Sequence, residues 1–298
     1  MQKCPTFFMN RQFKVKILRN ADLKNFCTFR IGGSADFVFI VENTFSLVEI
    51  CKFCKANNIK FKVIGLGANL LFADNGYRGA IIVNRCNNVK IFGKNVYADS
   101  GVRVGQLIQK CISKHLCGLE NLAGIPSTVG GAVVNSLGAY TTNFYDYVDY
   151  VICYDTYKNK FVKLKAVDCE FGYRTSAFKH NNLLILRVKL KLKHDKPLNI
   201  STRMQQAITN KKNSQPLNKA SAGSVFKRSE IIPAKVIDEL NLKGTRVGDA
   251  EISTKHAGFI VNLNSATSND VKTLITFIKN KVKEKTEVDL ETEIEFVD

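Results

Sequence analysis

The sequence lacks an apolar run of about 18 residues, the length at which a segment becomes a candidate for crossing a membrane as a helix. Its start, MQKCPTFFMNRQFKVK, lacks the long apolar stretch and the small-residue cleavage site of a secretory signal. We therefore expect a cytoplasmic protein without a membrane-spanning segment. The sequence also shows no repeat with a period of about 20 to 50 residues, which argues against a solenoid.

The paired motifs of a zinc site are missing as well. The 9 cysteines are scattered, and Cys51 and Cys54 form the only Cys-x-x-Cys motif, with no second pair at zinc-finger spacing. We expect no bound metal and interpret the cysteines as buried, reduced thiols.

Acidic residues are too few to balance the basic ones. The chain has 26 Asp and Glu against 44 Lys and Arg, a formal net charge of +18. Such an excess suggests a polyanionic partner: nucleic acid, a membrane surface or phosphorylated small molecules. No RRM, zinc-finger or helix-turn-helix signature accompanies the lysines, which are spread along the chain. We therefore expect no specific nucleic-acid binding, and a solvated lysine-rich surface is the simpler interpretation.

What is present is an ordinary globular pattern, since 298 residues with 45% hydrophobic content suggest about two domains. Apolar and alternating runs predict strands at 35–41, 59–65, 79–83, 148–155, 160–165 and 183–192, and a hairpin at 89–101. Helical spacing predicts helices at 45–58, 104–116, 231–240 and 268–285. Strands and helices mix without strict βαβ alternation, which favours an α+β fold.

Three local expectations can be checked against the fold. Thr44 is the expected N-cap of the first helix, and its apolar positions are Phe45, Val48, Ile50 and Phe53. A polar stretch at 195–220 indicates a domain boundary near 195. At the end of the chain Val288, Leu290, Ile294 and Phe296 alternate with carboxylates, which predicts a strand with one buried face.

The glycine pair in VIGLGANLLFADNG, Gly65 and Gly67, raises the question of a dinucleotide loop. A Rossmann fingerprint needs a third glycine where Leu70 stands, followed by a helix. Instead, Asp74-Asn75-Gly76 predicts a turn between strands, so a Rossmann fold is excluded. The glycines still permit a tight turn or a close approach of the backbone to a ligand.

A second glycine-rich stretch, GLENLAGIPSTVGGAVVNSLGAY, covers 118–140. Its small residues and amides suit a backbone laid against a flat ligand or a diphosphate. Close helix packing is the alternative, but two such loops could cradle one dinucleotide between them.

Other candidates carry charge or a hydroxyl. Arg174 lies among aromatic residues in FGYRTSAFK, a setting suited to carboxylate binding. Ser224 precedes Lys227 and Arg228 in SAGSVFKR, where a hydroxyl could donate a proton beside cations for a phosphate. Glu293 shares its strand face with three other carboxylates, and nothing local distinguishes it. Each candidate has a simpler alternative. Arg174 could be a surface arginine, Ser224 part of a glycine-serine turn, and Glu293 part of a solvated acidic face.

Taken in order, these stretches resemble the UDP-N-acetylenolpyruvoylglucosamine reductase (MurB) family, in its shorter form. The matching strings run from about residue 25 to residue 296: CTFRIGGSADF, VIGLGANLLFADNGYRGAII, GLENLAGIPSTVGGAVVNSLGAY, FGYRTSAFK, SAGSVFKR, LKGTRVGDAEISTKHAGFIVN and LETEIEF. The resemblance implies an FAD-binding fold of the vanillyl-alcohol-oxidase type in two subdomains, at 1–195 and split near 85. A C-terminal α/β substrate-binding domain would follow at 196–298, its last strand returning Glu293.

The family resemblance implies a flavoenzyme of peptidoglycan synthesis, which reduces UDP-N-acetylglucosamine enolpyruvate to UDP-N-acetylmuramate with FAD and NADPH. It implies Arg174, Ser224 and Glu293 as catalytic residues, with Ser224 as the proton donor, and a monomeric protein. Tyr173, Lys227 and Arg228 are the candidates for substrate binding. The residues expected to line FAD are Gly65, Leu66, Gly67, Ala68, Asn69, Leu70, Gly124, Ile125, Ser127, Thr128, Gly131 and Ala132.

The chain departs from the family pattern at Ala68, Ser127, Ser136 and Ser229, the first three in the expected flavin site. Three alternatives follow: another FAD oxidoreductase of the same fold, a family member without turnover, and a basic nucleic-acid-binding module. The last would leave both glycine loops without a purpose.

Overall fold

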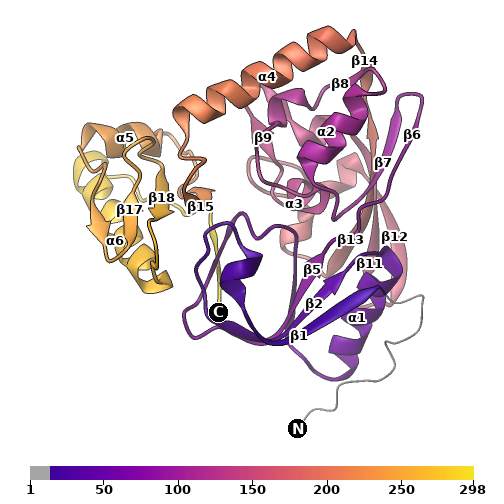
Figure 1. Ribbon diagram of the computed structural model, residues 1–298, viewed down its shortest axis with the longest axis horizontal. Helices are drawn as coiled ribbons and strands as arrows, with labels where there is room; N and C mark the ends of the chain where they lie inside the picture. The colour runs from indigo at the N-terminus through magenta and orange to yellow at the C-terminus, as the bar shows by residue number, and fades with distance from the viewer. Residues whose placement is uncertain (1–13) are drawn as a thin grey trace. The chain divides into compact units, whose positions relative to one another are not determined.

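The computed structural model describes residues 14–298 (Figure 1), so the start of the chain, where a secretory signal would lie, is outside the described residues. The chain divides into two compact units, each built from separated segments. Unit 1 contains the segments up to Arg19, Phe37–Gly65 and Gly79–Ala207; unit 2 contains Asn20–Asp36, Leu66–Arg78 and Ile208–Asp298. The chain passes between the units for the last time inside helix α4 (Pro197–Ser214), just after the boundary expected near 195.

The first sheet has four strands in the order β1 (Val15–Asp22), β2 (Ser34–Val41), β5 (Tyr77–Asn84) and β3 (Phe61–Ile64), with β3 parallel to β5. Helix α1 (Thr44–Ala56) packs into a buried cluster with this sheet through Leu47, Ile50 and Cys51.

The N-cap expected at Thr44 is wrong by one residue. Asn43 caps α1, because its side chain accepts a hydrogen bond from the amide of Ser46 at 2.7 Å. The buried face holds Leu47, Cys51 and Cys54, whereas Phe45, expected on that face, is 50% exposed.

A five-stranded antiparallel sheet forms the rest of unit 1, in the order β12 (Lys160–Lys165), β11 (Val148–Asp155), β13 (Leu183–Lys191), β7 (Asn95–Asp99) and β6 (Val89–Phe92). The strands and hairpin expected here are confirmed. Helix α2 (Val104–Ile112) is shorter than expected, because His115 has φ of 57° and Leu116 begins β8 (Leu116–Cys117), which pairs with β14 (Lys193–His194).

Short elements connect this sheet. They are α3 (Val129–Val134), the strand pair β9 (Gly138–Ala139) and β10 (Thr142–Asn143), and the 3₁₀ turns η3 (Glu120–Leu122), η4 (Phe144–Tyr147), η5 (Ala166–Cys169) and η6 (Ala177–Lys179).

Unit 2 is built on a sheet of β15 (Ala220–Ser224), β18 (Phe259–Asn262), β17 (Ala250–Ile252) and β16 (Arg246–Val247). It also contains η2 (Leu23–Phe26), α5 (Pro233–Glu239) and α6 (Ser268–Thr286). The apolar stripe predicted for α6 is buried, at Val271, Leu274, Ile275, Ile278 and Val282. The Asp74 carboxylate accepts hydrogen bonds from the amides of Ser268 and Asn269, so the turn after the first glycine loop caps α6.

The C-terminal strand is shorter than its alternating pattern predicts. Only β19 (Glu295–Val297) is a strand, parallel to β4 (Leu70–Phe72). Leu290 and Ile294 are buried, but Phe296 is 36% exposed and Val297 is buried instead. The pairing with β4 therefore reverses which face is covered at the end of the chain.

The described part of the chain contains no helix both long and apolar enough to cross a membrane. Among residues 14–298 there is also no group of His, Cys, Asp or Glu that could hold a metal ion.

Candidate functional site

The two glycine-rich stretches meet in unit 1. Gly65 follows β3, and a Cβ added there would lie 2.4 Å from Oγ1 of Thr128, so no other residue fits at this contact without a shift. Thr128 is the N-cap of α3, and its Oγ1 accepts a hydrogen bond from the amide of Gly131 at 3.2 Å. The contact between Gly65 and Thr128 confirms that the loops lie side by side at this point.

The second glycine stretch is fastened along its length to residues 100–104. Val129 donates to the carbonyl of Val102 at 2.8 Å, Gly130 donates to Ser100 at 2.8 Å, and Val104 donates to Ser127 at 2.9 Å. Arg103 and Thr128 face each other across this antiparallel bridge. The loop backbone is therefore preorganised by hydrogen bonds on one side.

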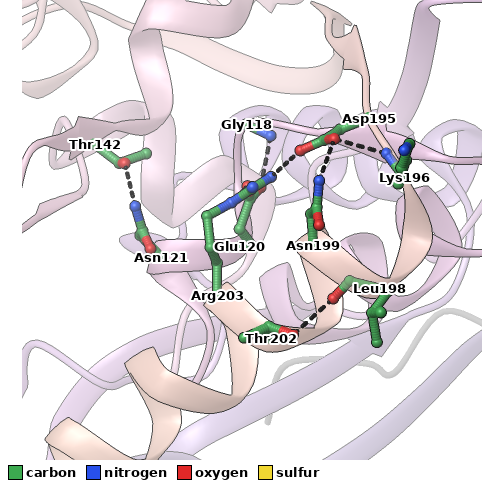
Figure 2. Close-up of polar contacts among 10 residues, drawn as sticks. All are labelled: Gly118, Glu120, Asn121, Thr142, Asp195, Lys196, Leu198, Asn199, Thr202 and Arg203. Atoms are coloured by element: carbon green, nitrogen blue, oxygen red, sulfur yellow. Dashed lines mark hydrogen bonds and ion pairs between the residues drawn. The ribbon is translucent and has the colours of Figure 1, made fainter.

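A partly buried ion-pair network holds the approach to this loop (Figure 2). The carboxylate of Glu120 accepts hydrogen bonds from the amide of Gly118 at 2.6 Å and from Nε of Arg203 at 2.7 Å. Arg203, on α4, also donates to Asp195 at 2.7 Å. The hydrogen bonds to Asp195 and Glu120 raise the pKa of Arg203, and the bond from Arg203 lowers the pKa of Asp195.

Glu120 starts η3, which leads directly into the expected flavin residues. Gly124 has φ of 81°, Ile125 donates to the carbonyl of Leu122 at 3.3 Å, and the hydroxyl of Ser127 donates to the carbonyl of Thr128 at 3.0 Å. Ala132 is fully buried in α3. Glu120 and Arg203 were not among the predicted site residues, because they lie 83 residues apart and meet only through the fold.

The remaining expected flavin residues, Leu66 to Leu70, belong to unit 2. Gly67 has φ of 61° and lies so close to the chain that a Cβ would be 2.4 Å from the carbonyl oxygen of Phe26. Asn69 donates from Nδ2 to the carbonyl of Glu293 at 3.0 Å and accepts from the amide of Glu295 at 2.9 Å. Ala68 is half-buried beside Asn69. The loop is thus tied to Glu293 and to the strand β19 that begins two residues later.

The loop with Arg174 is a tight turn in unit 1. Gly172 and Thr175 exchange backbone hydrogen bonds at 3.1 and 3.3 Å, and Arg174 between them has φ of 54°. The guanidinium lies 5.8 Å from the ring centre of Tyr173, which is 55% exposed.

This turn is anchored to α3. The hydroxyl of Ser136 donates to the carbonyl of Thr175, and the hydroxyl of Ser176 donates to the carbonyl of Val134 at 2.8 Å. Arg174 is thereby held on the same scaffold as the second glycine stretch.

Ser224 and Glu293 are brought together in unit 2. Ser224 ends β15 next to Gly223, whose φ is 79°. The amide of Glu293 donates to the carbonyl of Val225 at 2.7 Å, and Phe226 faces Thr292 across a β-bridge. The serine loop and residues 291–293 therefore run antiparallel, and this pairing places the backbone of Glu293 beside Val225.

The same antiparallel pairing fixes the position of Lys227. Its amide donates to the carbonyl of Glu291 at 2.9 Å, and its ammonium group forms an ion pair with the carboxylate of Glu291. Arg228 follows directly, outside the bridge. Lys227 is therefore positioned by an acidic neighbour, and its binding to a diphosphate stays a prediction.

The residues of the two glycine stretches fit the diphosphate part of FAD. At Gly65 the absence of a side chain allows a ligand to approach the backbone closely, while the amides of Gly130 and Gly131 and the hydroxyl of Ser127 donate within unit 1 and hold the shape of the loop. The serine at 127 is accommodated, because its hydroxyl hydrogen-bonds within the loop itself.

Comparisons with known proteins agree with this arrangement. A family model described as "FAD binding domain" matches residues 35–160, and one described as "UDP-N-acetylenolpyruvoylglucosamine reductase, C-terminal domain" matches residues 215–297. The UDP-N-acetylenolpyruvoylglucosamine reductase of Clostridium novyi is 37% identical over 95% of this chain and 93% of its own. That of Syntrophomonas wolfei is 36% identical over 95% of both chains.

A solved structure shows the same similarity. The crystal structure of UDP-N-acetylenolpyruvylglucosamine reductase (MurB) from Thermus caldophilus matches with a TM-score of 0.80 and 32% identity, over 96% of this chain and 100% of that one. The two domain matches, the full-length relatives and this structure establish that the chain belongs to the UDP-N-acetylenolpyruvoylglucosamine reductase (MurB) family.

Proposed function

We propose that Arg174, Ser224 and Glu293 are the catalytic residues with which this chain reduces UDP-N-acetylglucosamine enolpyruvate. The family membership gives the reaction, in peptidoglycan precursor synthesis, and its cofactors, FAD and NADPH. The observation that carries the residue assignment is the hydrogen bond from Glu293 to Val225, which sets the glutamate beside the serine loop.

The two glycine-rich stretches would hold FAD, which would supply the hydride chemistry that links NADPH to C3 of the enolpyruvyl group. Ser224 then gives its hydroxyl proton to C2, so that the double bond becomes a saturated lactyl ether. A serine hydroxyl is a weak acid, but an enolate carbon is a strong base, and a fixed position compensates for an unfavourable pKa. The strand end at Ser224, which is paired with Phe259 across the sheet, provides such a position.

Arg174 and Glu293 act on the carboxylate of the same group. The guanidinium complements the negative charge that develops on the carboxylate side, and the tight Gly172–Thr175 turn fixes its backbone. Glu293 must carry a proton to donate a hydrogen bond there, because an ionised carboxylate would repel the enolate.

Tyr173, Lys227 and Arg228 are proposed to bind the rest of the substrate. Tyr173 exposes more than half of its surface beside Arg174, and Arg228 adds a cation next to Lys227. A UDP diphosphate is a suitable partner for both cations.

The residue assignment is tested by separating the two half-reactions. Ser224→Ala should leave flavin reduction by NADPH intact and slow enolpyruvate-dependent reoxidation by about 10²–10⁴-fold. Ser221→Ala, in the same strand, is the matched control and should leave both half-reactions unchanged. Full-rate reoxidation in Ser224→Ala would show that another group donates the proton.

A monomeric state, a cytoplasmic location and the absence of nucleic-acid binding are further parts of the proposal. Part of the positive charge can bind the phosphate groups of small ligands, so nucleic-acid binding is not needed to explain that part. Sedimentation of the FAD-loaded protein, alone and with single-stranded RNA, tests the first and third: a dimer or a comigrating complex would contradict them.

A further inference from the structure

Two arginines stand next to the second glycine stretch without a counter-charge. Arg85 follows β5, and Arg103 precedes α2. Within residues 14–298, neither guanidinium forms an ion pair with a carboxylate. Four other arginines do so: Arg78 with Asp36, Arg187 with Asp99, Arg203 with Glu120 and Arg246 with Glu251.

The backbone holds these two residues near each other. Asn84 donates from Nδ2 to Oγ of Ser100 at 2.8 Å, one residue before Arg85. A Cβ added at Gly101 would lie 2.6 Å from the amide nitrogen of Cys86, so the two chain segments are in direct contact. Arg85 is placed between these two fixed points.

The electrostatics agree with this closeness. Burial and the positive charge of Arg103 together lower the pKa of Arg85. Arg85 is half-buried and Arg103 is exposed, so their repulsion acts mainly on Arg85, and a bound anion would relieve it.

Arg103 lies opposite the second glycine stretch, and Arg85 belongs to the segment that contacts Gly101. Arg103 faces Thr128 across the antiparallel bridge, and Thr128 contacts Gly65 of the first glycine stretch. All of these residues belong to unit 1. Guanidinium groups bind phosphate oxygens in a bidentate manner, and glycine amides supply further donors.

We propose that Arg85 and Arg103 form a phosphate subsite that neutralises the diphosphate of FAD. The sequence alone does not reveal it, because the two arginines are 18 positions apart and lie in different elements. The proposal rests on flavin binding by this family, and it assigns residues of this chain to that binding.

The test is the affinity of the apoprotein for FAD, measured by the quenching of flavin fluorescence. Arg85→Met and Arg103→Met should each raise the dissociation constant for FAD about tenfold, as expected for losing one charge-assisted hydrogen bond. The effect should shrink at high ionic strength, and Arg85→Lys should recover part of the affinity. Arg19→Met removes an exposed charge beside Phe37 and is the matched control, with unchanged affinity expected.

Riboflavin, UDP and NADPH are the three probes that show whether the two arginines bind the phosphate groups of FAD or those of another ligand. Riboflavin, which has no phosphate, should bind the variants as it binds the unaltered protein. Inhibition by UDP and the KM for NADPH should also be unchanged. An unchanged FAD dissociation constant, or a change confined to NADPH or UDP, would overturn the proposal. If the unaltered protein bound no FAD, the flavoenzyme function itself would fail instead.

Discussion

The backbone of Glu293 is fastened to two separate segments of unit 2. Its backbone is hydrogen-bonded on both sides, to Val225 at 2.7 Å and to Asn69 at 3.0 Å. Glu295, two residues later, is an exposed carboxylate in β19. The alternating pattern of the sequence treats the two alike, because neither of these hydrogen bonds is local.

Glu293→Gln tests whether a proton on this side chain is needed. An amide donates a hydrogen bond without ionising, so the variant should retain more activity than Glu293→Ala, for which we expect a loss of about 10²–10³-fold. Its rate should also lack any fall at alkaline pH that arises from ionisation of Glu293. Glu295→Gln should stay within about twofold of the unaltered enzyme. Equal losses in Glu293→Gln and Glu293→Ala would refute a donor role.

The buried cysteines of residues 14–298 are predicted to be poor nucleophiles. Burial raises the pKa of Cys54, Cys86, Cys111 and Cys153 to about 12 each, so their thiolate fractions at pH 8 are very small. Cys117 is the one of the eight described cysteines that is not buried. Iodoacetamide at pH 8, followed by peptide mass spectrometry, should label Cys117 before the other seven described cysteines. Earlier labelling of Cys51 or Cys54 would contradict the packing of α1.

At the scale of elements, regular strands could be predicted and long-range contacts could not. The strands at 148–155 and 160–165 have the bounds that the alternating pattern predicts. The last strand is shorter than predicted, and at its end Val297 is buried instead of Phe296. The local pattern could not predict this, because the partner strand β4 lies more than 200 residues away in the sequence. The glycine loops were recognisable from composition, but the contact of Gly65 with Thr128 and the pairing of 225–227 with 291–293 come only from the fold.

Helix α4 is expected to hold the glycine loop through Arg203. The Glu120 side chain is 7% exposed and Arg203 is 39% exposed. Because the arginine is partly solvated, we expect Arg203→Met to lower the free energy of unfolding by about 1–3 kcal/mol, less than for a fully buried pair. Urea denaturation of the apoprotein measures this.

Arg246→Met is the matched control for that variant. It also removes an arginine from a buried glutamate, Glu251, but in unit 2, and Arg246 is 60% exposed. We expect a smaller loss of stability and unchanged FAD affinity, whereas Arg203→Met should weaken FAD binding by loosening the Gly118–Glu120 turn. Equal FAD affinities in both variants would show that the network stabilises the fold without positioning the loop.

At the scale of the whole molecule, this basic chain has the fold and the domains of a flavin reductase of the MurB family. The departures at Ala68, Ser127 and Ser136 do not disturb the loops around them: Ser127 and Ser136 both form hydrogen bonds within unit 1, and Ala68 lies beside the tied Asn69. The net charge of +18 exceeds what two polyanionic ligands require, and nothing in the structure explains the remainder.

The most direct test is the visible absorption spectrum of the purified protein, recorded without oxygen. We predict a flavin band that bleaches when NADPH is added and returns when UDP-N-acetylglucosamine enolpyruvate follows. A protein that takes up no FAD, or a bleached band that the enolpyruvate does not restore, would contradict the account.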